Sequence, residues 1–319
     1  MSSLSQPQII GIDVSADWLD VYDLISRQSQ RFSNTPDGYN HLIQIAQETQ
    51  AEACFEATGG HEWCLWSALV DAGIPARQLP PAQIKAFAKS QGKRAKTDRI
   101  DAQLIAEFAA FRPTCGRRLP EQNQRYIRAL TTKRQQLVAI RKQILLQQKA
   151  QLACGNGDHF EQIDDDILAL LSDKIASLEN SIQHAINQDQ ALVRKDQILR
   201  SIPGVGPVTS AMVIAELPEL GTIKSEAAAA LVGVAPFAHD SGKAMGKRAI
   251  SGGRMKLRNV IFQAALVARN CNPNLKLFAQ RLKAKGKPHK VIITAVARKL
   301  ISIMNSLCKN DALWKDIAN

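Results

Sequence analysis

The stretch from Ile9 to Ser15, IIGIDVS, decides the fold of the first part of the chain. Its apolar residues run into one acidic residue, Asp13, which is typical of a buried β-strand that ends at the edge of a sheet. Further strand-like runs follow at 18–25 (WLDVYDLI), 30–35 (QRFSNT), 51–58 (AEACFEAT) and 74–80 (IPARQLP), with helix-like runs between the later ones. This alternation predicts an α/β domain that opens with a three-stranded meander.

The remainder of the chain has helical periodicity. Pro113 and Pro120 bracket a linker, after which apolar residues recur at helical spacing over 121–152 and again over 162–200. The break CGNGDHF separates these two runs, so they predict two long antiparallel helices that pack as a coiled coil. From residue 202 onward the sequence predicts shorter helices separated by glycine-rich turns.

The charge of the chain is concentrated in one block. The 319 residues include 41 Lys and Arg against 29 Asp and Glu, a net charge of +12. Sixteen of the basic residues and no acid fall between Ser241 and Asn310, and the rest of the chain, with 25 basic and 29 acidic residues, has a net charge of −4. Such a block suits a solubilising face, an anionic membrane or a phosphate backbone, and its glycine turns and apolar helices favour nucleic acid.

Composition also bears on the cellular compartment. The longest run without a polar side chain, Ala227 to Ala238, has twelve residues, short of the ~18 that a membrane span needs. No basic residue precedes the first apolar stretch, and the six cysteines contain no C-x-x-C pair. We therefore expect no membrane span, secretory signal or zinc ribbon, and a cytoplasmic protein.

Carboxylates supply the candidate chemistry of the first domain. Asp13 ends one strand, Glu56 ends another in CFEATGG, and Asp98 and Asp101 share a helix face at i, i+3 in KTDRIDAQLIAEF. If these elements are neighbours, four carboxylates converge on a site for Mg²⁺, able to hold two ions about 4 Å apart around a phosphodiester. Taken singly, each has a simpler interpretation, as a turn cap, as a helix cap or as the partner of a lysine.

Basic residues surround the carboxylate helix in the sequence. They would hold phosphates beside the metal site, or else form a solvated surface. These residues are Lys85, Lys89, Lys93, Arg94, Lys96 and Arg99.

A glycine turn in the third region is a second candidate for phosphate binding. In LRSIPGVGPVTSAMVIAEL, Gly204 and Gly206 form a tight turn between two helices. Glycines let the backbone approach a phosphate, and the N–H groups that begin the next helix point toward it. The stretch looks like a helix-hairpin-helix element, although an ordinary helical hairpin also fits.

A serine lies in the basic block that follows. Ser241 is in a glycine-flanked loop, with Lys243, Lys247 and Arg248 soon after it. Most serines of this kind form turns, but one beside a phosphate-binding surface has the surroundings needed to attack phosphorus. Further candidates for contact with the phosphate backbone of a nucleic acid are Arg254, Lys256, Arg258, Lys283, Lys285 and Lys287.

Taken in order, these motifs resemble a known family. GIDVS, FEATGG, KTDRIDA, SIPGVGPVTSAMVIAEL, LVGVAPFAHDSG and GGRMKLRNVIFQAA resemble the DEDD transposases of insertion-sequence family 110, the Piv-type recombinases, over nearly the whole chain. The resemblance implies a RuvC-like domain of the RNase H fold at 1–112, a linker and coiled coil at 113–200, and a basic transposase domain at 201–319. It also implies a recombinase of a mobile element, guided by a structured bridge RNA.

The resemblance assigns roles to individual residues. It makes Asp13, Glu56, Asp98 and Asp101 the DEDD set that binds Mg²⁺ or Mn²⁺, and Ser241 the nucleophile. The match of the serine to the family pattern is less secure than that of the carboxylates, because the loop after Ser241 also carries Ser251, the alternative nucleophile. The implied partners are donor and target DNA, the bridge RNA and further copies of the chain, as a dimer and as a tetramer on two DNA sites, acting at the nucleoid.

Two other functions fit the residues. A RuvC-like nuclease that resolves branched DNA with metal-activated water needs the four carboxylates but no serine, although it has little use for some 200 residues of coiled coil and basic domain. A nucleic-acid scaffold with purely structural carboxylates needs neither. A covalent protein–DNA adduct distinguishes the recombinase from the nuclease, and metal-dependent cleavage distinguishes both from the scaffold.

Overall fold

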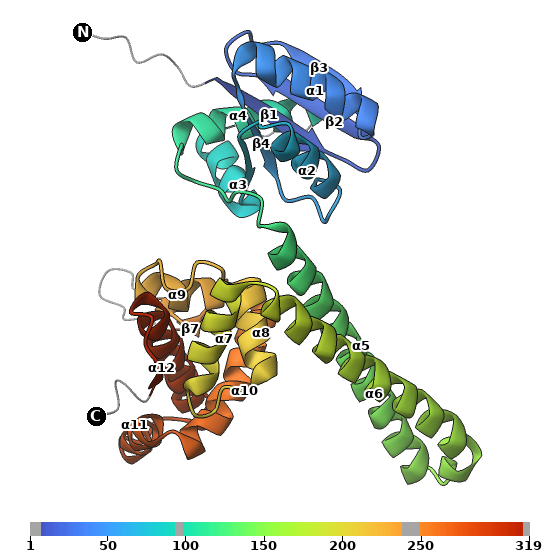
Figure 1. The fold of residues 1–319 in the computed structure, drawn as a ribbon, viewed down its shortest axis with the longest axis vertical. Helices are drawn as coiled ribbons and strands as arrows, with labels where there is room; N and C mark the ends of the chain where they lie inside the picture. Colours follow the sequence, from blue (N-terminus) through green and yellow to red (C-terminus); the bar gives the residue numbers. More distant parts are fainter. Residues whose placement is uncertain (1–7, 93–97, 238–248, 315–319) are drawn as a thin grey trace. The chain divides into compact units, whose positions relative to one another are not determined.

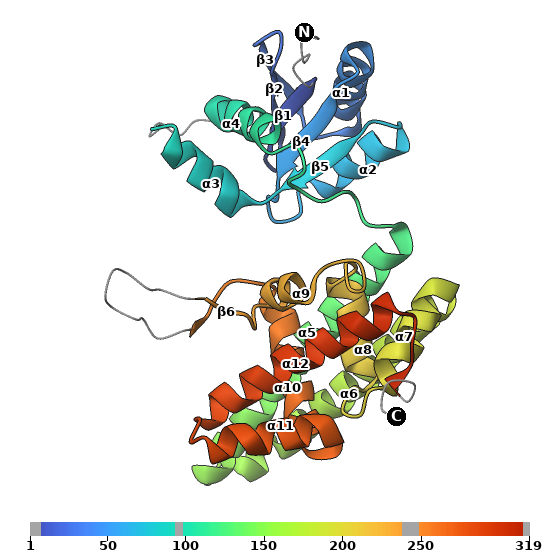
Figure 2. The same ribbon diagram turned by 90° about the vertical axis from the view of Figure 1, so that its left-hand side faces the viewer.

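The computed structural model describes residues 8–92, 98–237 and 249–314, the side chains of Asp98, Arg99 and Asp158 excepted. The chain forms two compact units, Met1–Pro120 and Glu121–Asn319. The first is a mixed α/β unit with helices on both faces of one sheet, and the second is mostly helical (Figures 1 and 2). An α/β part followed by helices is what the sequence predicts, and the finer division at residues 112 and 200 stays a prediction.

One five-stranded sheet organises the first unit. Its strands are β1 (Ile9–Val14), β2 (Trp18–Asp23), β3 (Ser29–Ser33), β4 (Glu52–Glu56) and β5 (Ala76–Leu79), in the order β3-β2-β1-β4-β5. β1, β2 and β3 form the expected antiparallel meander, whereas β4 and β5 run parallel to β1. β1 is therefore central, as its continuous apolar sequence requires. The topology is compatible with the RNase H-like fold that the resemblance implies.

Helices cover both faces of this sheet. They are α1 (Pro36–Thr49) and α2 (Trp63–Asp71) on one face, and α3 (Pro81–Ser90) and α4 (Asp98–Phe111) on the other. Because side chains alternate along a strand, Ile10 and Ile12 enter the core under α1 and α2, whereas Ile9 enters the core under α4. Each face of β1 thus has its own buried layer.

Gly11 sets how closely α4 packs on β1. A Cβ atom at this position would lie 2.2 Å from the carbonyl oxygen of Ala102 and 2.8 Å from the Cβ atom of Ala106. Both helix residues are alanines, so backbone meets backbone with no side chain between them. The glycine of GID therefore fixes the position of α4 on the sheet.

Two long helices begin the second unit and lie side by side (Figure 1). α5 (Gln122–Ala153) and α6 (Gly157–Asn187) are joined by a short turn in which Gly155 has φ +76°. The second helix is shorter than the predicted 162–200, because the chain breaks and α7 (Gln190–Ser201) begins separately. Asp189 causes the break, since its carboxylate accepts hydrogen bonds from the N–H groups of Ala191 and Leu192 and so caps a new helix.

The remaining helices, together with α7 and parts of α5 and α6, form the largest hydrophobic core among the described residues. These remaining helices are α8 (Pro207–Glu216), α9 (Ser225–Val232), α10 (Met255–Cys271), α11 (Pro273–Ala284) and α12 (His289–Lys309). Val213, Ile261, Val296 and Leu300 are fully buried where these helices meet. A short ribbon of β6 (Pro236–Phe237) and β7 (Ala249–Ile250) extends from this core beside α9 (Figure 2).

In the part of the chain that the structure describes, α12 is the one helix long and apolar enough to cross a membrane. Half of its apolar window is buried inside the protein. Core helices of globular domains have the same composition, so the length and apolarity of α12 are weak evidence for a span.

Candidate functional site

Two predicted site residues end neighbouring strands of the sheet. Ile12 of β1 pairs with Phe55 of β4 in the parallel register, and Asp13 and Glu56 are the next residue of each strand. Phe55 belongs to the core under α1 and α2, and Cys54 to the core under α4. Alternation therefore directs Glu56, like Asp13, to the face that α4 covers. Asp13 and Glu56 therefore end neighbouring strands on the same face of the sheet, which is the condition that the predicted shared site requires.

The other two predicted carboxylates lie in the first turn of α4. Asp101 immediately precedes Ala102, the residue whose carbonyl oxygen abuts Gly11, two positions before Asp13 on β1. The start of α4 is therefore fixed against the strand that carries Asp13. Asp98 begins the helix, but its side chain lies outside the description. Among the described side chains, no group of three or more His, Cys, Asp and Glu is arranged to hold a metal ion.

A fully buried thiol lies on the same face of the sheet. Cys54 is one pleat before Glu56 on the same face of β4 and has no exposed surface. Burial raises the pKa of the Cys54 thiol to about 12, against a smaller lowering effect of Arg77. The thiol is therefore neutral at physiological pH and adds no charge beside the carboxylates.

A further carboxylate, missed from the sequence, lies beside Asp13. Asp20 of β2 is the antiparallel partner of Asp13, so both side chains project from the same face. Arg31 of β3 donates two hydrogen bonds of 2.9 Å to the two oxygens of Asp20. Asp20 could have been found only from the register in which IIGIDV pairs with WLDVYD. The sequence analysis considered each strand separately and so did not predict that register.

The loop after Glu56 is held by a second residue that the sequence analysis missed. Glu62 is 3% exposed, and its carboxylate accepts hydrogen bonds from the hydroxyl of Thr58 (3.0 Å), the N–H of Gly60 (3.0 Å) and the amide of Gln78 (2.7 Å). Arg117 bonds the same Gln78 and lies over the rings of two tryptophans of α2. The buried Glu62 therefore ties the loop to β5 and fixes the chain just beyond Glu56.

The basic residues predicted near α4 are only partly described. Lys85 and Lys89 are exposed on α3. Lys93, Arg94 and Lys96 lie outside the described residues, as does the side chain of Arg99.

The glycine turn joins α7 to α8 as predicted, but its two glycines have different surroundings. Gly204 has φ +98°, and a Cβ atom there would lie 2.6 Å from the Cα atom of Ala268 on α10. Gly206 precedes α8 and has open space on its Cβ side. Gly204 is thus required for packing, and only Gly206 leaves the backbone accessible to a ligand at the start of a helix.

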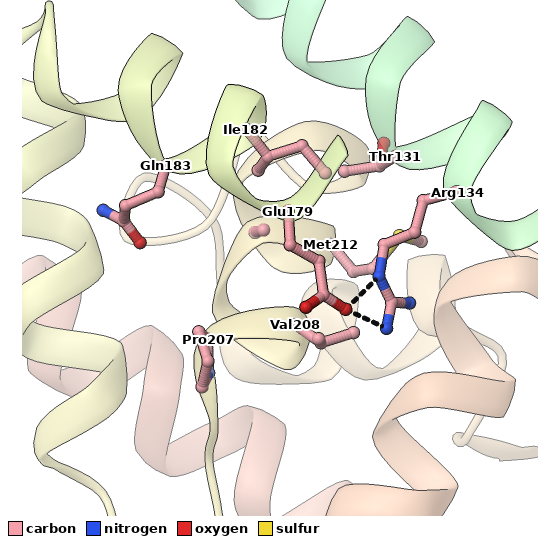
Figure 3. Close-up of a pocket in the computed structure, with 9 residues that line it drawn as sticks. Thr131, Arg134, Glu179, Ile182, Gln183, Pro207, Val208 and Met212 are labelled. Carbon is pink, nitrogen blue, oxygen red and sulfur yellow. Dashed lines mark hydrogen bonds and ion pairs between the residues drawn. The ribbon is translucent and has the colours of Figure 1, made fainter. Parts of the chain in front are cut away.

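A small cavity of about 60 Å³ lies where α5, α6 and the start of α8 meet. Figure 3 shows Arg134 of α5 and Glu179 of α6 pointing toward each other beside Val208 and Met212 of α8. The guanidinium and the carboxylate are 2.6 Å apart at their closest atoms. The ion pair joins α5 to α6, and the apolar side chains of α8 line the same cavity.

The predicted nucleophile, Ser241, lies between β6 and β7 in the sequence. Ser241, Lys243, Lys247 and Arg248 are outside the described residues. The alternative serine, Ser251, follows β7 directly and is exposed.

The root of the ribbon is tightly built. Gly233 and Gly253 meet back to back, so that a Cβ atom on Gly253 would lie 2.4 Å from the nitrogen of Gly233. Arg258 donates hydrogen bonds to the carbonyls of Gly233 (3.3 Å) and Gly252 (2.9 Å). Arg254 donates to the backbone carbonyl of Glu216 and forms an ion pair of 2.7 Å with Glu219. These two arginines were predicted to contact the phosphate backbone of a nucleic acid. In the structure both bind other residues of the protein at the base of the ribbon.

The remaining predicted basic residues are exposed. Lys256 lies in the first turn of α10, and Lys283, Lys285 and Lys287 lie at the end of α11 and just after it. Lys283 and Lys287 line a hollow of about 350 Å³ together with three basic residues that the sequence analysis did not single out. These are Arg269, Lys276 and His289.

Comparison with known proteins defines the class. A family model for DEDD transposases of the IS110 type, described as "Transposase", matches residues 10–154. A second model, described as "Transposase IS116/IS110/IS902 family", matches residues 196–280. With the α/β unit and the helical unit, these matches define a transposase, an enzyme that processes DNA. The chain belongs to the IS110 family of transposases.

Curated relatives agree with this assignment. The chain is similar to the pilin gene-inverting protein of Moraxella bovis, with 27% identity over 317 residues, 95% of this chain and 96% of the relative. It is also similar to the transposase for insertion sequence element IS1111A of Coxiella burnetii, with 23% identity over 296 residues, 83% of this chain and 77% of the relative. The match to a DEDD transposase domain also suggests the use of a divalent metal ion.

Proposed function

We propose that this transposase is a recombinase that cuts and rejoins the DNA strands of its own insertion sequence under the guidance of a structured RNA. One observation carries the proposal above the others. Asp13 and Glu56 end adjacent parallel strands on the face covered by α4, the helix that begins with Asp98 and Asp101. Four carboxylates on three elements that meet in this way are expected at a phosphoryl-transfer site rather than at a structural cap.

The donor set fits a hard divalent cation. Asp13, Glu56, Asp98 and Asp101 offer oxygen ligands only, which Mg²⁺ and Mn²⁺ prefer. Such an ion, when bound, neutralises charge on the phosphate oxygens. The chain's own contribution is to keep the carboxylates in place, through the hydrogen-bonded register of β1 and β4, the contact of α4 with Gly11 and the loop tied by Glu62.

We assign the attack on DNA to the hydroxyl of Ser241. Its oxygen forms a bond to phosphorus, the bond from phosphorus to a deoxyribose oxygen breaks, the serine proton passes to water and the departing oxygen takes a proton from water. The ester is thereby kept as a phosphoserine, which a second DNA end can attack to restore the serine. The close packing at the root of the β6–β7 ribbon supports this assignment, because the segment that contains Ser241 begins and ends at these two strands. Ser251 remains the alternative.

The proposed partners are donor DNA, target DNA and a bridge RNA whose base pairing selects the sequences. The exposed lysines of the basic block and the open N-terminus of α8 at Gly206 are proposed to hold phosphates, the latter as a helix-hairpin-helix-like element. The RuvC-like part at 1–112 would hold the carboxylates and the part at 201–319 the serine. We place the activity in the cytoplasm, at the nucleoid.

We further propose that copies of the chain assemble as a dimer, and as a tetramer on two DNA sites, through the helical pair α5 and α6 within the predicted linker and coiled coil at 113–200. The far part of α5 and α6 leaves large apolar side chains in water, an arrangement that favours association. The most exposed of them, between 47% and 60%, are Leu145, Leu146, Leu152, Ile163 and Leu170.

Trapping the covalent intermediate tests the proposed function. The complex of protein, RNA and DNA is denatured, digested to peptides and searched for a peptide bearing a nucleotide. We expect the adduct on Ser241 and none in Ser241→Ala, while Ser251→Ala remains active. An adduct on Ser251 would move the nucleophile, and metal-dependent cleavage without any adduct would favour the RuvC-like nuclease instead.

A further inference from the structure

The root of the β6–β7 ribbon borders a hollow of about 560 Å³. The ribbon contributes Ile250, α10 contributes Asn259 and Phe262, and α12 contributes Val291 and Thr294. Its floor is apolar and open to solvent on one side. Its lining includes Pro236 and Ala249, which belong to the two strands that flank Ser241 in the sequence. None of the roles assigned above uses this hollow.

The apolar lining lacks a partner within the described part of the chain. Val291 is 50% exposed and Ile250 is 38% exposed. Phe262 packs against the hydrophobic core and is partly exposed toward the hollow. An exposed apolar patch bordered by polar residues often marks a binding site, and an aromatic side chain such as Phe262 in the lining can pack against a ring of a ligand.

The rim of the hollow selects the charge of the ligand. Lys290 and Arg298 are exposed at either end of the α12 segment that lines it, about 12 Å apart along the helix axis at 1.5 Å per residue. Among the described residues that line the hollow, none is acidic. Neither cation forms an ion pair with a described residue. A ligand that seats here must therefore carry negative charge beside its apolar part.

Two polar side chains add the means to recognise a ring edge. The exposed Asn259 carries both a donor and an acceptor on its amide. Thr294 donates its hydroxyl proton to the carbonyl of Lys290 at 2.9 Å, so its oxygen remains able to accept. An amide of this kind matches the donor and acceptor edge of a nucleobase.

From these features we propose that the hollow binds one unpaired, unstacked nucleotide of a nucleic-acid strand. The base lies against Phe262 and Val291, and the phosphates on its two sides contact Lys290 and Arg298. An apolar protein segment would fill the floor but leave both cations unpaired, so the charges favour a nucleotide. The inference rests on the proposed function, because it takes nucleic acid as the ligand. It adds a site that holds a strand at the root of the β6–β7 ribbon.

Binding of two matched probes to the full-length protein tests the proposal. One probe is a short duplex, and the other is the same duplex with a single extra nucleotide in one strand, each made in DNA and in RNA. We expect the protein to bind the probe with the extra nucleotide about fivefold or more tightly in at least one of the two chemistries, the order of magnitude of one base stacked on an aromatic side chain. Equal affinity in both chemistries would overturn the proposal.

Two variants and a control locate the effect. Val291→Glu places an acid in the hollow, and Val267→Glu makes the same change on α10 at a valine of similar exposure, 56%, outside the hollow. The ratio of the two affinities should fall to about one in Val291→Glu and persist in Val267→Glu, while Phe262→Leu should reduce it about threefold or more. A ratio unchanged in Val291→Glu would overturn the site. The serine adduct is measured on the same variants, so failure of the nucleotide site with the adduct intact leaves the proposed function standing.

Discussion

Asp13 of β1 lies opposite Asp20 of β2 in the antiparallel register, and the carboxylate of Asp20 accepts hydrogen bonds of 2.9 Å from Nε and Nη2 of Arg31. The side chain of Asp20 is only 12% exposed, whereas that of Arg31 is 50% exposed. The negative charge of Asp20 on β2, beside the proposed metal site, is therefore compensated by Arg31 of β3.

Removing Arg31 should leave that charge uncompensated. We expect Arg31→Gln to lower the free energy of unfolding by about 1–2 kcal/mol in EDTA, because a largely buried carboxylate loses its partner. Urea titration measures the change. If a divalent ion binds beside Asp13, Mg²⁺ should restore more stability to this variant than to the wild type. The double variant Asp20→Asn with Arg31→Gln is the control, and a loss of stability as large as in the single variant would contradict the explanation.

The carboxylate set should be needed for chemistry and not for binding. Asp13→Asn and Glu56→Gln are each expected to reduce strand cleavage by at least about a hundredfold, with nucleic-acid affinity nearly unchanged. Thermal melting with and without Mn²⁺ gives a second measurement, because the ion-dependent rise of the wild type should disappear. Asp17→Asn, at an exposed aspartate between β1 and β2, is the control. Cleavage retained in both site variants would exclude a shared metal site.

Glu62 should stabilise the loop beyond Glu56. Glu62→Ala leaves the donors of Thr58, Gly60 and Gln78 without their acceptor, so the free energy of unfolding should fall by about 2–4 kcal/mol. The Mg²⁺ concentration for half-maximal cleavage should also rise, since the displaced loop begins at Glu56. Glu48→Ala, at an exposed glutamate of α1, should change stability by less than about 0.5 kcal/mol. A mild loss of stability with an unchanged metal requirement would limit Glu62 to an ordinary packing role.

The basic residues should separate into two groups by their salt dependence. Replacing the exposed Lys283, Lys285 and Lys287 by alanine should weaken affinity for all sequences alike, and should flatten the slope of log affinity against log salt by about 0.9 per lost phosphate contact. Arg254→Gln should instead destabilise the fold and leave the slope nearly unchanged, because Glu219 and the carbonyl of Glu216 already engage this guanidinium. Fluorescence anisotropy over a range of salt measures both. An effect of the lysines on one DNA sequence only would mean that they read bases.

The exposed apolar residues of the helical pair should control assembly. Leu146→Ser with Ile163→Ser is expected to weaken association about tenfold or more in sedimentation equilibrium. The stability of the separate chain should change little, because both side chains are more than half exposed. Leu277→Ser, at a leucine of α11 with 53% exposure, is the matched control.

Mixing of inactive chains follows from the same assembly. If the proposed site combines the carboxylates of one chain with the serine of another, Asp13→Ala and Ser241→Ala should restore part of the activity when mixed. The apolar double substitution should abolish that rescue. A monomer on DNA in solution scattering would contradict shared sites.

The sequence predicts the sheet well because its information is local. The alternation in IIGIDV and WLDVYD indicates strands, and the position of Glu56 at the end of the next buried strand is enough to expect it beside Asp13. Asp20 was missed because its proximity to Asp13 depends on a strand register. The break at Asp189 was missed because apolar spacing continues across it, although a helix cap interrupts the backbone there.

Charge was the least predictable property. Arg254 and Arg258 read as part of a basic block, yet the structure engages both at the root of the ribbon. Which arginines remain available to a ligand depends on acids and carbonyls far away in the sequence, such as Glu219 and Gly233. Lysines on the exposed end of α11 carry no such contacts in the described part of the chain. Their exposure is what contact with a phosphate backbone requires, and the contact itself stays a prediction.

The contact between Gly11 and α4 has a genetic consequence. A methyl group at residue 11 would collide with the backbone of Ala102, and the helix that must then retreat is the one that begins with Asp98 and Asp101. A random screen for mutants that fail to transpose should therefore recover changes at a residue with no functional group, at a frequency like that of the acids themselves. Selection at residue 11 would then act on the distance between the strand and α4, and glycine would be retained there as strictly as any catalytic side chain.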